Sequence, residues 1–363
     1  MTYKEIEHIP KMKNSLNALS PYIGKMRPEL ASYLINHYSQ NEGYIYDPFA
    51  GSGTILVEGW RQGHDVIGND LNYYAYILTL GKTHPYPNKE SAINALDSYR
   101  NRVEKKVIQY NIEYIPEWIR VFFDSQTLKE ICCWVNYLKR NKEWFLLSCL
   151  MGILHHQRPG FLSYPSSHGA PYLRTSKYPR EDFPEMYQYR NVYEKLYSKI
   201  TRAYKDMPTF DFEKKRIITN KNTGNLTLKN IHASTIITSP PYMKSLTYAR
   251  DNRLRLWFLG LDDWRNLDKT ISPTQMNFYE MMQKSIYRWS NSQVAGDKCV
   301  IVIGDIQSTY NGEKVSMGNA LIDLAVDKYN FIEAFSDPIP ESRKVVKGNT
   351  KINKESILVL ERK

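Results

Sequence analysis

The sequence predicts an α/β fold in which a doubly wound, mostly parallel sheet of seven strands carries a largely helical insertion. Three observations support this prediction. Short apolar runs alternate with helical segments over residues 43–82, this alternation stops over 88–214, and it returns from residue 215 onward. We therefore expect a sheet-forming domain made of residues 1–87 and 215–363, and a separate insertion made of residues 88–214.

The first repeat reads as strand, glycine turn and helix. Tyr44-Ile45-Tyr46 is a short apolar run, and Gly51 and Gly53 allow a tight turn whose backbone can approach a ligand closely. The next strand ends at Asp70, about 20 residues beyond the turn, where doubly wound nucleotide folds place a carboxylate on ribose hydroxyls. The third glycine of the dinucleotide pattern is replaced by Leu56, which disfavours hydride chemistry on a nicotinamide.

The central and C-terminal parts differ in their periodicity. Residues 91–113 have helical periodicity, 127–154 are densely aromatic and apolar, and 158–180 are rich in Pro, Gly and Ser. The last two strands are too close for a helical crossover, so we expect them to pair antiparallel. The expected later strands lie at about 215–219, 234–238, 298–303, 330–335 and 356–361, with helices near 274–294 and 316–328.

The most informative stretch is Thr238-Ser239-Pro240-Pro241-Tyr242, which follows a short apolar run. Consecutive prolines have a fixed φ and no N–H, so their neighbouring carbonyls are rigid acceptors. The Ser239 hydroxyl adds another acceptor, and Tyr242 offers a face for stacking a base, a contact of about 1–3 kcal/mol. Acceptors that hold the protons of an exocyclic amine indicate methyl transfer to that amine. A strand end followed by an ordinary loop is the alternative for this segment alone.

Charge and cysteine content narrow the functional classes. The net charge of +11 at pH 7 suits a polyanionic partner, although a basic protein without such a partner has the same composition. The four cysteines have no metal-site spacing, and none lies beside a proline to attack cytosine carbon 5. The N-terminus has no signal-like core and no run is long enough to cross a bilayer, so we expect a cytoplasmic location with no metal and no membrane contact.

These motifs together resemble the S-adenosylmethionine-dependent DNA amino-methyltransferases. Asp47-Pro48-Phe49-Ala50-Gly51-Ser52-Gly53-Thr54 resembles their methionine-donor loop, and the stretch from Thr238 to Tyr242 resembles their catalytic loop. Residues 22–35 resemble the segment that closes over the methionine, and residues 339–343 and 355–360 resemble the last loop and strand. In this family Ser before the prolines is mostly associated with cytosine-N4 methylation, whereas Asp or Asn is more typical of adenine-N6 enzymes.

The resemblance implies S-adenosylmethionine as cofactor, the methyltransferase form of the sheet with its antiparallel last strand, and double-stranded DNA as partner. It leaves open a cognate restriction nuclease as a second partner. Asn222 is the candidate acceptor in a segment, 217–222, that lacks the acid often found there in the family. The implied catalytic residues are Ser239, Pro240, Pro241 and Tyr242; the implied cofactor contacts are Lys25, Pro28, Asp47, Pro48, Phe49, Ala50, Gly51, Ser52, Gly53, Thr54, Asp70, Leu71, Asn222 and Thr238.

Target recognition is expected in the insertion. No Asp or Glu occurs from residue 144 to residue 180, where basic and aromatic residues alternate, a mixture suited to DNA contact. The alternative is a buried helix over 144–154 followed by a surface loop. The predicted DNA-binding residues are Arg158, Arg174, Lys177, Arg180, Arg250 and Arg253, and Arg255 is a further candidate for phosphate contact on the helix after the catalytic loop.

Three other functions stay open at this point. Methylation of adenine N6 requires the same two loops. An RNA methyltransferase acting on a guanine amino group resembles the chain in the same places, but such enzymes usually bring a separate RNA-binding domain. A catalytically inert DNA-binding protein would keep the fold without turnover.

Overall fold

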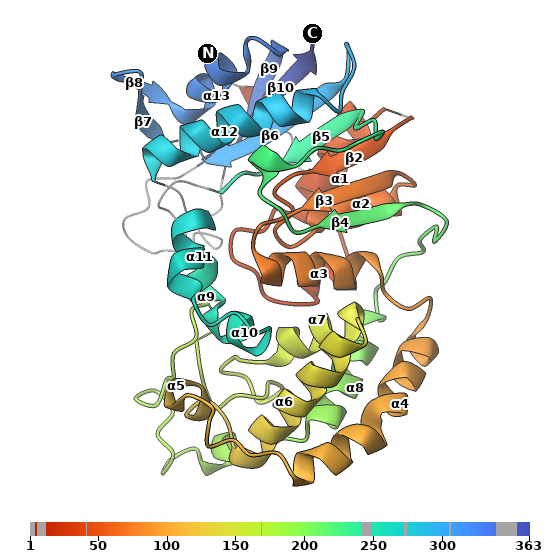
Figure 1. The fold of residues 1–363 in the computed structure, drawn as a ribbon, viewed down its shortest axis with the longest axis vertical. Helices are drawn as coiled ribbons and strands as arrows, with labels where there is room; N and C mark the ends of the chain where they lie inside the picture. The colour runs from red at the N-terminus through yellow and green to blue at the C-terminus, as the bar shows by residue number, and fades with distance from the viewer. Residues whose placement is uncertain are drawn as a thin grey trace.

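The computed structural model describes residues 4–5, 12–40, 42–167, 169–241, 248–271, 274–304, 306–338 and 354–363. Its sheet has the strand order β1-β9-β10-β6-β5-β2-β3-β4 (Figure 1). The seven strands that the sequence predicts are all present, and the two-residue β1 adds an eighth at the edge. They are β1 (Lys4–Glu5), β2 (Tyr44–Asp47), β3 (Asp65–Asn69), β4 (Arg216–Thr219), β5 (Thr235–Thr238), β6 (Lys298–Gly304), β9 (Tyr329–Pro338) and β10 (Lys354–Arg362).

The sheet is parallel except for one strand. β2 pairs with β3 and β5, β3 pairs with β4, and β5 pairs with β6, all in parallel register. β10 runs antiparallel to both β6 and β9, as predicted for strands joined without a crossover helix. The chain winds from β2 toward β4 and then from β5 toward β6. The order therefore reverses between β2 and β5, where the carboxyl ends of the strands open a crevice.

Alternate side chains of each strand enter two different cores. Ile45, Val66 and Ile237 face one core, and their neighbours Tyr46, Ile67 and Ile236 face the other. Helices on both faces bury these side chains, which confirms the predicted doubly wound α/β fold. The helices next to the strands are α1 (Pro28–Tyr38), α2 (Thr54–Arg61) and α3 (Tyr73–Thr83) on one face, and α12 (Gln275–Ser290) and α13 (Met317–Ala325) on the other.

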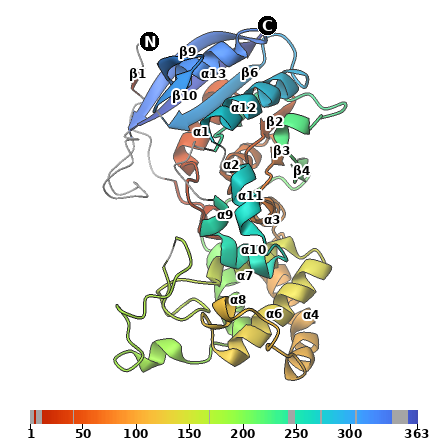
Figure 2. The same cartoon turned by 60° about the vertical axis from the view of Figure 1, so that its left-hand side comes forward.

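The insertion is largely helical, and it packs closely on the sheet domain. Figure 2 shows it at the opposite end of the molecule from the sheet. α7 lies so near α3 that a Cβ on Gly81 would be 2.2 Å from Ser148 Oγ. One continuous hydrophobic core includes both helices. Division of the chain at residues 87 and 215 stays a prediction. The helices of the insertion are α4 (Lys89–Ile108), α5 (Glu117–Arg120), α6 (Ser125–Arg140), α7 (Trp144–Ile153) and α8 (Val192–Ala203).

A β-hairpin and a helix over 264–271 have no counterpart in the sequence-based expectation, and the single helix expected after the catalytic stretch is divided into two. A hairpin of β7 (Gln307–Tyr310) and β8 (Glu313–Ser316) follows β6, and three short helices bridge the sheet domain and the insertion (Figure 1). These are α9 (Tyr248–Asp251), α10 (Arg253–Phe258) and α11 (Trp264–Ile271). Among the helices of the described ranges, none combines the length and apolarity that crossing a bilayer requires.

Candidate functional site

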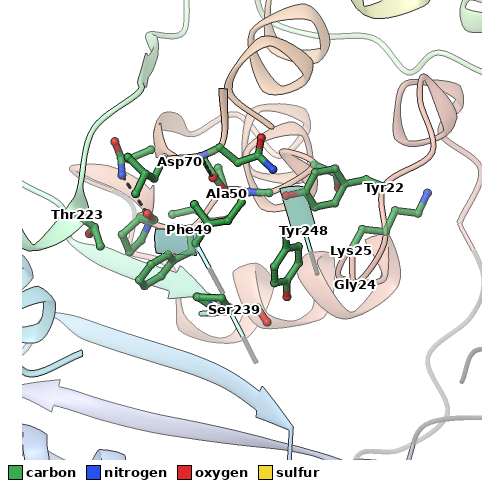
Figure 3. A pocket seen from close by; sticks show the side chains of 18 of the residues that line it. Tyr22, Gly24, Lys25, Phe49, Ala50, Asp70, Thr223, Ser239 and Tyr248 are labelled. Carbon is green, nitrogen blue, oxygen red and sulfur yellow. Dashed lines mark hydrogen bonds between the residues drawn. The ribbon is translucent and has the colours of Figure 1, made fainter. Parts of the chain in front are cut away.

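A cavity of about 380 Å³ lies where the strand order reverses, at the carboxyl ends of β2, β3 and β5. In Figure 3, Thr223 and Phe49 lie at one end of it and Lys25 at the other, with Asp70 and Ala50 between them. The predicted residues that line the cavity are Lys25, Asp47, Pro48, Phe49, Ala50, Gly51, Ser52, Thr54, Asp70, Leu71, Asn222, Ser239 and Pro241.

The glycine turn forms the wall between β2 and α2. Gly51 and Gly53 have φ values of 51° and 72°, which favour glycine over any residue with a Cβ. A Cβ on Gly53 would also lie 2.9 Å from Thr79 Oγ1 and 3.2 Å from Thr79 Cα, whereas the nearest atom to a Cβ on Gly51 is 3.5 Å away. Buried Lys82 donates to the carbonyl of Ser52 at 2.7 Å. The turn is therefore fixed on one side by α3, while Gly51 has room for a Cβ at van der Waals distance from the Tyr22 ring.

Asp70 connects two walls of the cavity. Its Oδ2 accepts from Gly51 N–H at 2.8 Å, and its Oδ1 accepts from Asn72 N–H at 2.8 Å. Burial raises the pKa of Asp70 to about 6, although both hydrogen bonds favour the charged form. Each carboxylate oxygen keeps a second lone pair. Asp70 therefore orders the turn and still offers acceptors to a ligand hydroxyl.

Asp47 joins the two motifs to each other. Thr238 Oγ1 donates to Asp47 Oδ1 at 2.8 Å, and Phe49 N–H donates to the same oxygen at 3.2 Å. Burial raises the pKa of Asp47 to about 7, and the Thr238 hydroxyl counters part of this rise. This bond is possible because β2 and β5 are adjacent parallel strands that end together. The segment containing Ser239 and the glycine turn thus share one buried hydrogen bond.

Asn69 is a positioning residue that sequence reasoning missed. Its Nδ2 donates to Lys221 O at 2.9 Å and to Pro48 O at 3.2 Å. Its Oδ1 accepts from Thr219 Oγ1 at 2.8 Å and from Lys221 N–H at 3.1 Å. One buried amide therefore holds the loops after β2 and β4 together. In the sequence it is only the last residue of a strand, next to the more conspicuous Asp70.

The cavity also contains residues that were not among the predicted contacts, some of them in the 22–35 segment that resembles the part closing over the methionine. Tyr22 lies over Gly51, and burial near Asp70 raises the pKa of its hydroxyl. Tyr248 begins α9 and lies on the same side of the cavity as Ser239 in Figure 3. Asn277 and Met281 lie on α12, where the sequence predicts a helix near 274–294, whereas no sequence pattern is assigned to α11. The other unpredicted lining residues are Gly24, Met26, Ile55, Asn69, Asn72, Lys221, Thr223, Lys269, Thr270, Ile271, Asn277 and Met281.

Some predicted residues do not line the cavity. Gly53 is the N-cap of α2, Pro28 is the first residue of α1, and Thr238 bonds Asp47. Pro240 is buried beside the lining residues Ser239 and Pro241. Tyr242 and the resemblance at 339–343 lie outside the described residues. The roles assigned to all of these residues stay predictions.

The predicted DNA-binding residues are divided between solvent and the protein's own fold. Arg158 and Lys177 are exposed, and exposed Arg180 lies over the rings of Tyr164 and Tyr187, 5.4 and 5.0 Å from their centroids. Arg174 instead donates to the side chain of Gln157. A role in DNA binding stays a prediction for this group.

The arginines after the catalytic stretch also differ from one another. Arg250 is exposed, whereas Arg253 donates to Arg250 O at 3.1 Å and to the carbonyl of Pro171. The expectation that Arg255 contacts phosphate is wrong. Its side chain is 1% exposed and donates to Met151 O at 3.0 Å, because it faces α7 rather than solvent.

Metal chemistry has no candidate ligand set in the described part of the chain, where no three His, Cys, Asp or Glu side chains gather to hold an ion. His155 and His156 follow α7 at its C-terminal end, and the four cysteines are free and buried.

Comparison with known proteins gives one family match and two matching relatives. Residues 4–80 match the family described as DNA methylase. The Type II methyltransferase M.MvaI of Kocuria varians is 34% identical over 111 residues, which are 28% of this chain and 24% of the relative. The Type II methyltransferase M.MjaII of Methanocaldococcus jannaschii is 26% identical over 132 residues, 36% of this chain and 22% of the relative. The chain thus spans about a quarter of the length of each.

Among solved structures, TrmN from Thermus thermophilus is similar in fold, with 9% sequence identity and a TM-score of 0.37. The overlay covers 94% of this chain and 50% of the TrmN chain. That overlay is too distant to bear on function. The family match covers the glycine turn with the strands on either side of it. The resemblance of this chain to the DNA amino-methyltransferases is thereby confirmed over residues 4–80, the part that matches the DNA methylase family.

Proposed function

We propose that this protein transfers a methyl group from S-adenosylmethionine to the exocyclic amine of a DNA base, and that the base is cytosine, modified at N4. One observation carries the proposal. Ser239 and Pro241 line the same cavity as Gly51 and Asp70, and the Thr238–Asp47 hydrogen bond joins their two segments. The proposed acceptors for the amine protons and the proposed nucleoside site are therefore parts of one cavity.

The side chains of the cavity fit the proposed cofactor. S-adenosylmethionine, when bound, supplies an electrophilic methyl group on a positively charged sulfur. Asp47 and Asp70 place two carboxylates at the strand ends, which favours a cationic ligand. Asp70 retains lone pairs for ribose hydroxyls, and the ring of Phe49 offers an apolar surface. The volume of about 380 Å³ lies within the range of about 300–1,000 Å³ typical of small-molecule sites.

Ser239 and its neighbours act on the target base. A duplex base has to leave the stack to reach such a cavity, at a cost of a few kcal/mol. The Ser239 Oγ and the Pro240 carbonyl each accept a hydrogen bond from one amine N–H, which leaves the nitrogen lone pair facing the methyl donor instead of delocalised into the ring. Tyr242 stacks on the base. The new N–C bond would form as the bond between the donor sulfur and the methyl carbon breaks and leaves that sulfur neutral, and the nitrogen would release one proton to water.

The choice of cytosine rests on Ser239. A hydroxyl before the two prolines is the form that the resemblance associates with cytosine N4, and adenine N6 is the second candidate. Because both relatives are named type II methyltransferases, we include a cognate restriction nuclease as a proposed partner.

Mass spectrometry of nucleosides tests the proposal directly. Unmethylated plasmid DNA is incubated with the protein and S-adenosylmethionine and then digested, and a parallel reaction contains RNA. We expect N4-methylcytosine in the DNA and no methylated RNA. N6-methyladenine would overturn the assignment of the base, and methylated RNA alone or no product at all would overturn the function.

Variants test the residue roles in the same assay. Loss of the Ser239 acceptor in Ser239→Ala should lower the transfer rate roughly tenfold or more, the effect of about 1.5–3 kcal/mol expected for one polar contact to a charged centre. Tyr242→Ala should lower it by a similar amount through lost stacking. Ser98→Ala, on the exposed surface of α4, is the matched control. Undiminished transfer in both site variants would remove the proposed roles.

A further inference from the structure

The lining of the cavity divides into a floor and an exposed rim with opposite charge. The only carboxylates among the described lining residues, Asp47 and Asp70, belong to the floor at the strand ends. The rim is defined here as the lining residues that are exposed to solvent. Three of its seven residues are lysines and none is acidic: Gly24, Lys25, Lys221, Asn222, Lys269, Thr270 and Asn277.

This division of charge matches the two proposed ligands. A carboxylate floor favours a cationic cofactor, and a lysine rim favours an anion that stays outside the cavity. When a base is flipped into a pocket, its flanking phosphates remain on the sugar-phosphate backbone at the entrance. Lysine is a common ligand of such phosphates, because its ammonium is a compact charge at the end of a flexible stem.

Lys269 is the rim lysine whose helix packs against the helix that follows the proposed catalytic loop. It lies on α11, which packs against α9, and Ala249 N–H of α9 donates to the carboxylate of the neighbouring Asp268 at 2.9 Å. Tyr248, the first residue of α9, lines the cavity with Ser239. The Lys269 ammonium is exposed, and its described hydrogen bond is a long one of 3.4 Å to Asn266 Oδ1.

The other two rim lysines lie elsewhere. Lys25 is at the end of the cavity beyond Tyr22 (Figure 3), and its ammonium donates to Asn17 O at 3.1 Å. Lys221 follows β4, where Asn69 holds its backbone next to the loop after β2. Lys269 is thus the rim cation that adjoins the helix following the proposed catalytic loop.

We propose that Lys269 binds a backbone phosphate beside the flipped nucleotide. The inference rests on the proposed function and adds a substrate contact to it. The contact between the Lys269 ammonium and the phosphate is ionic, so removing the charge changes how strongly added salt weakens DNA binding. Removing the Lys269 charge leaves the floor of the cavity unchanged, and therefore also the binding of the cofactor.

The test measures kcat/KM for methyl transfer to unmethylated plasmid DNA from 50 to 200 mM KCl. Lys269→Met should lower kcat/KM about tenfold or more at the middle of this range, the size of one charge-assisted hydrogen bond. It should also reduce the slope of log kcat/KM against log salt by about 1, since about one counterion fewer is released. Lys269→Arg should restore most of the slope. Calorimetry should give the wild-type affinity for S-adenosylmethionine in both variants.

Lys215→Met is the matched control. Lys215 is an exposed lysine that precedes β4, at the amino end of the strand and so at the opposite edge of the sheet from the cavity. An unchanged salt slope in Lys269→Met, or an equal change in Lys215→Met, would overturn the inference while leaving the proposed function in place. A wild-type protein that methylates no DNA would overturn the proposed function itself.

Discussion

Charged side chains have different uses in the strand-end cavity and in the insertion. In the cavity, Asp47 and Asp70 are held by backbone and hydroxyl donors and line an open volume. In the insertion, buried Arg190 donates to Met186 O at 2.7 Å and Leu162 O at 3.3 Å, so its charge supports the loop over 155–190. Arg180 lies on two tyrosine rings but remains exposed.

This difference shows which kind of sequence evidence locates a site. A charged residue directly after a parallel strand is placed by the sheet, because all such strand ends meet at one edge. A basic residue in an irregular segment has no comparable frame, so composition alone does not say whether it faces DNA, an aromatic ring or a carbonyl. The following predictions test each side of the comparison.

Removal of the Asp70 carboxylate should have the largest effect. Asp70→Ala loses the hydrogen bonds from the backbone N–H groups of Gly51 and Asn72, and also the proposed ribose acceptor. At about 1.5–3 kcal/mol for each bond to a charged group, affinity for S-adenosylmethionine should fall about a hundredfold or more. Calorimetry measures it. Asp65→Ala, at the other end of the same strand, should bind normally. Equal affinities in the two variants would refute the role of Asp70.

The two glycines of the turn should differ in stability when replaced. Gly53→Ala combines a left-handed φ with a clash against Thr79, so we expect a loss of about 2–4 kcal/mol in the free energy of unfolding. Gly51→Ala has the same strain from a left-handed φ but no clash, so we expect its free energy of unfolding to fall by only about 1 kcal/mol. Denaturant titration of both variants provides the comparison. A Gly51 variant that is the less stable of the two would contradict it.

The acidity of the floor should appear in the pH dependence of cofactor binding. Because the pKa values of Asp70 and Asp47 are raised to about 6 and about 7, both are increasingly protonated below neutral pH, and affinity for a cationic ligand should rise with pH through this window. Thr238→Val removes a hydrogen bond that lowers the pKa of Asp47, so its midpoint should move upward. Calorimetry from pH 5.5 to 8 measures the shift, and a downward shift would contradict the proposed contact.

The same two carboxyl groups make the free energy of unfolding fall as pH rises, which is the opposite of their effect on cofactor affinity. Their ordinary pKa is 3.8, so the folded protein binds more protons than the unfolded chain between about pH 4 and 7. Their contribution is therefore fully present below pH 4 and is lost as pH rises through 6 and 7. Asp47→Asn should remove part of this loss, as measured by urea unfolding at pH 5 and 8.

The exposed arginine of the insertion should give the smallest change in stability. Arg180→Ala should alter the free energy of unfolding by no more than about 0.5 kcal/mol, because its side chain is exposed, yet reduce the salt slope of DNA binding by about 1 if it contacts phosphate. Arg190→Ala should destabilise by about 2 kcal/mol or more, since buried carbonyls lose their donor. Unfolding and DNA-binding titrations separate the two. An unchanged salt slope of DNA binding in Arg180→Ala would show that Arg180 does not contact a DNA phosphate.

The strands and the meeting of the two motifs could be predicted from the sequence. Apolar runs identified the strands, and Ser239 and Asp70 share a cavity because each follows a parallel strand. Arg255 could not be assigned, because residues 253–258 alternate basic and apolar side chains in a helix. Residues two apart in a helix point about 200° from each other, so Arg253 and Arg255 could not both face the same surface.

Other parts of the site depend on tertiary contacts that no local pattern specifies. Lys269 reaches the rim because α11 packs on α9, and both helices are short. Asn69 acts through four bonds to segments as far as 152 residues away. Its role therefore becomes visible only once β3 and β4 are paired.

The pairing of β2 with β5 has a consequence for how the protein is made. Residue 45 pairs with residue 235, so nearly two hundred residues are synthesised before the strand that covers this side of β2 leaves the ribosome. During that interval β2 presents an unpaired edge that invites intermolecular pairing. We expect the emerging chain to recruit chaperones in this window, and the helices between the two strands to gain structure ahead of the catalytic crevice.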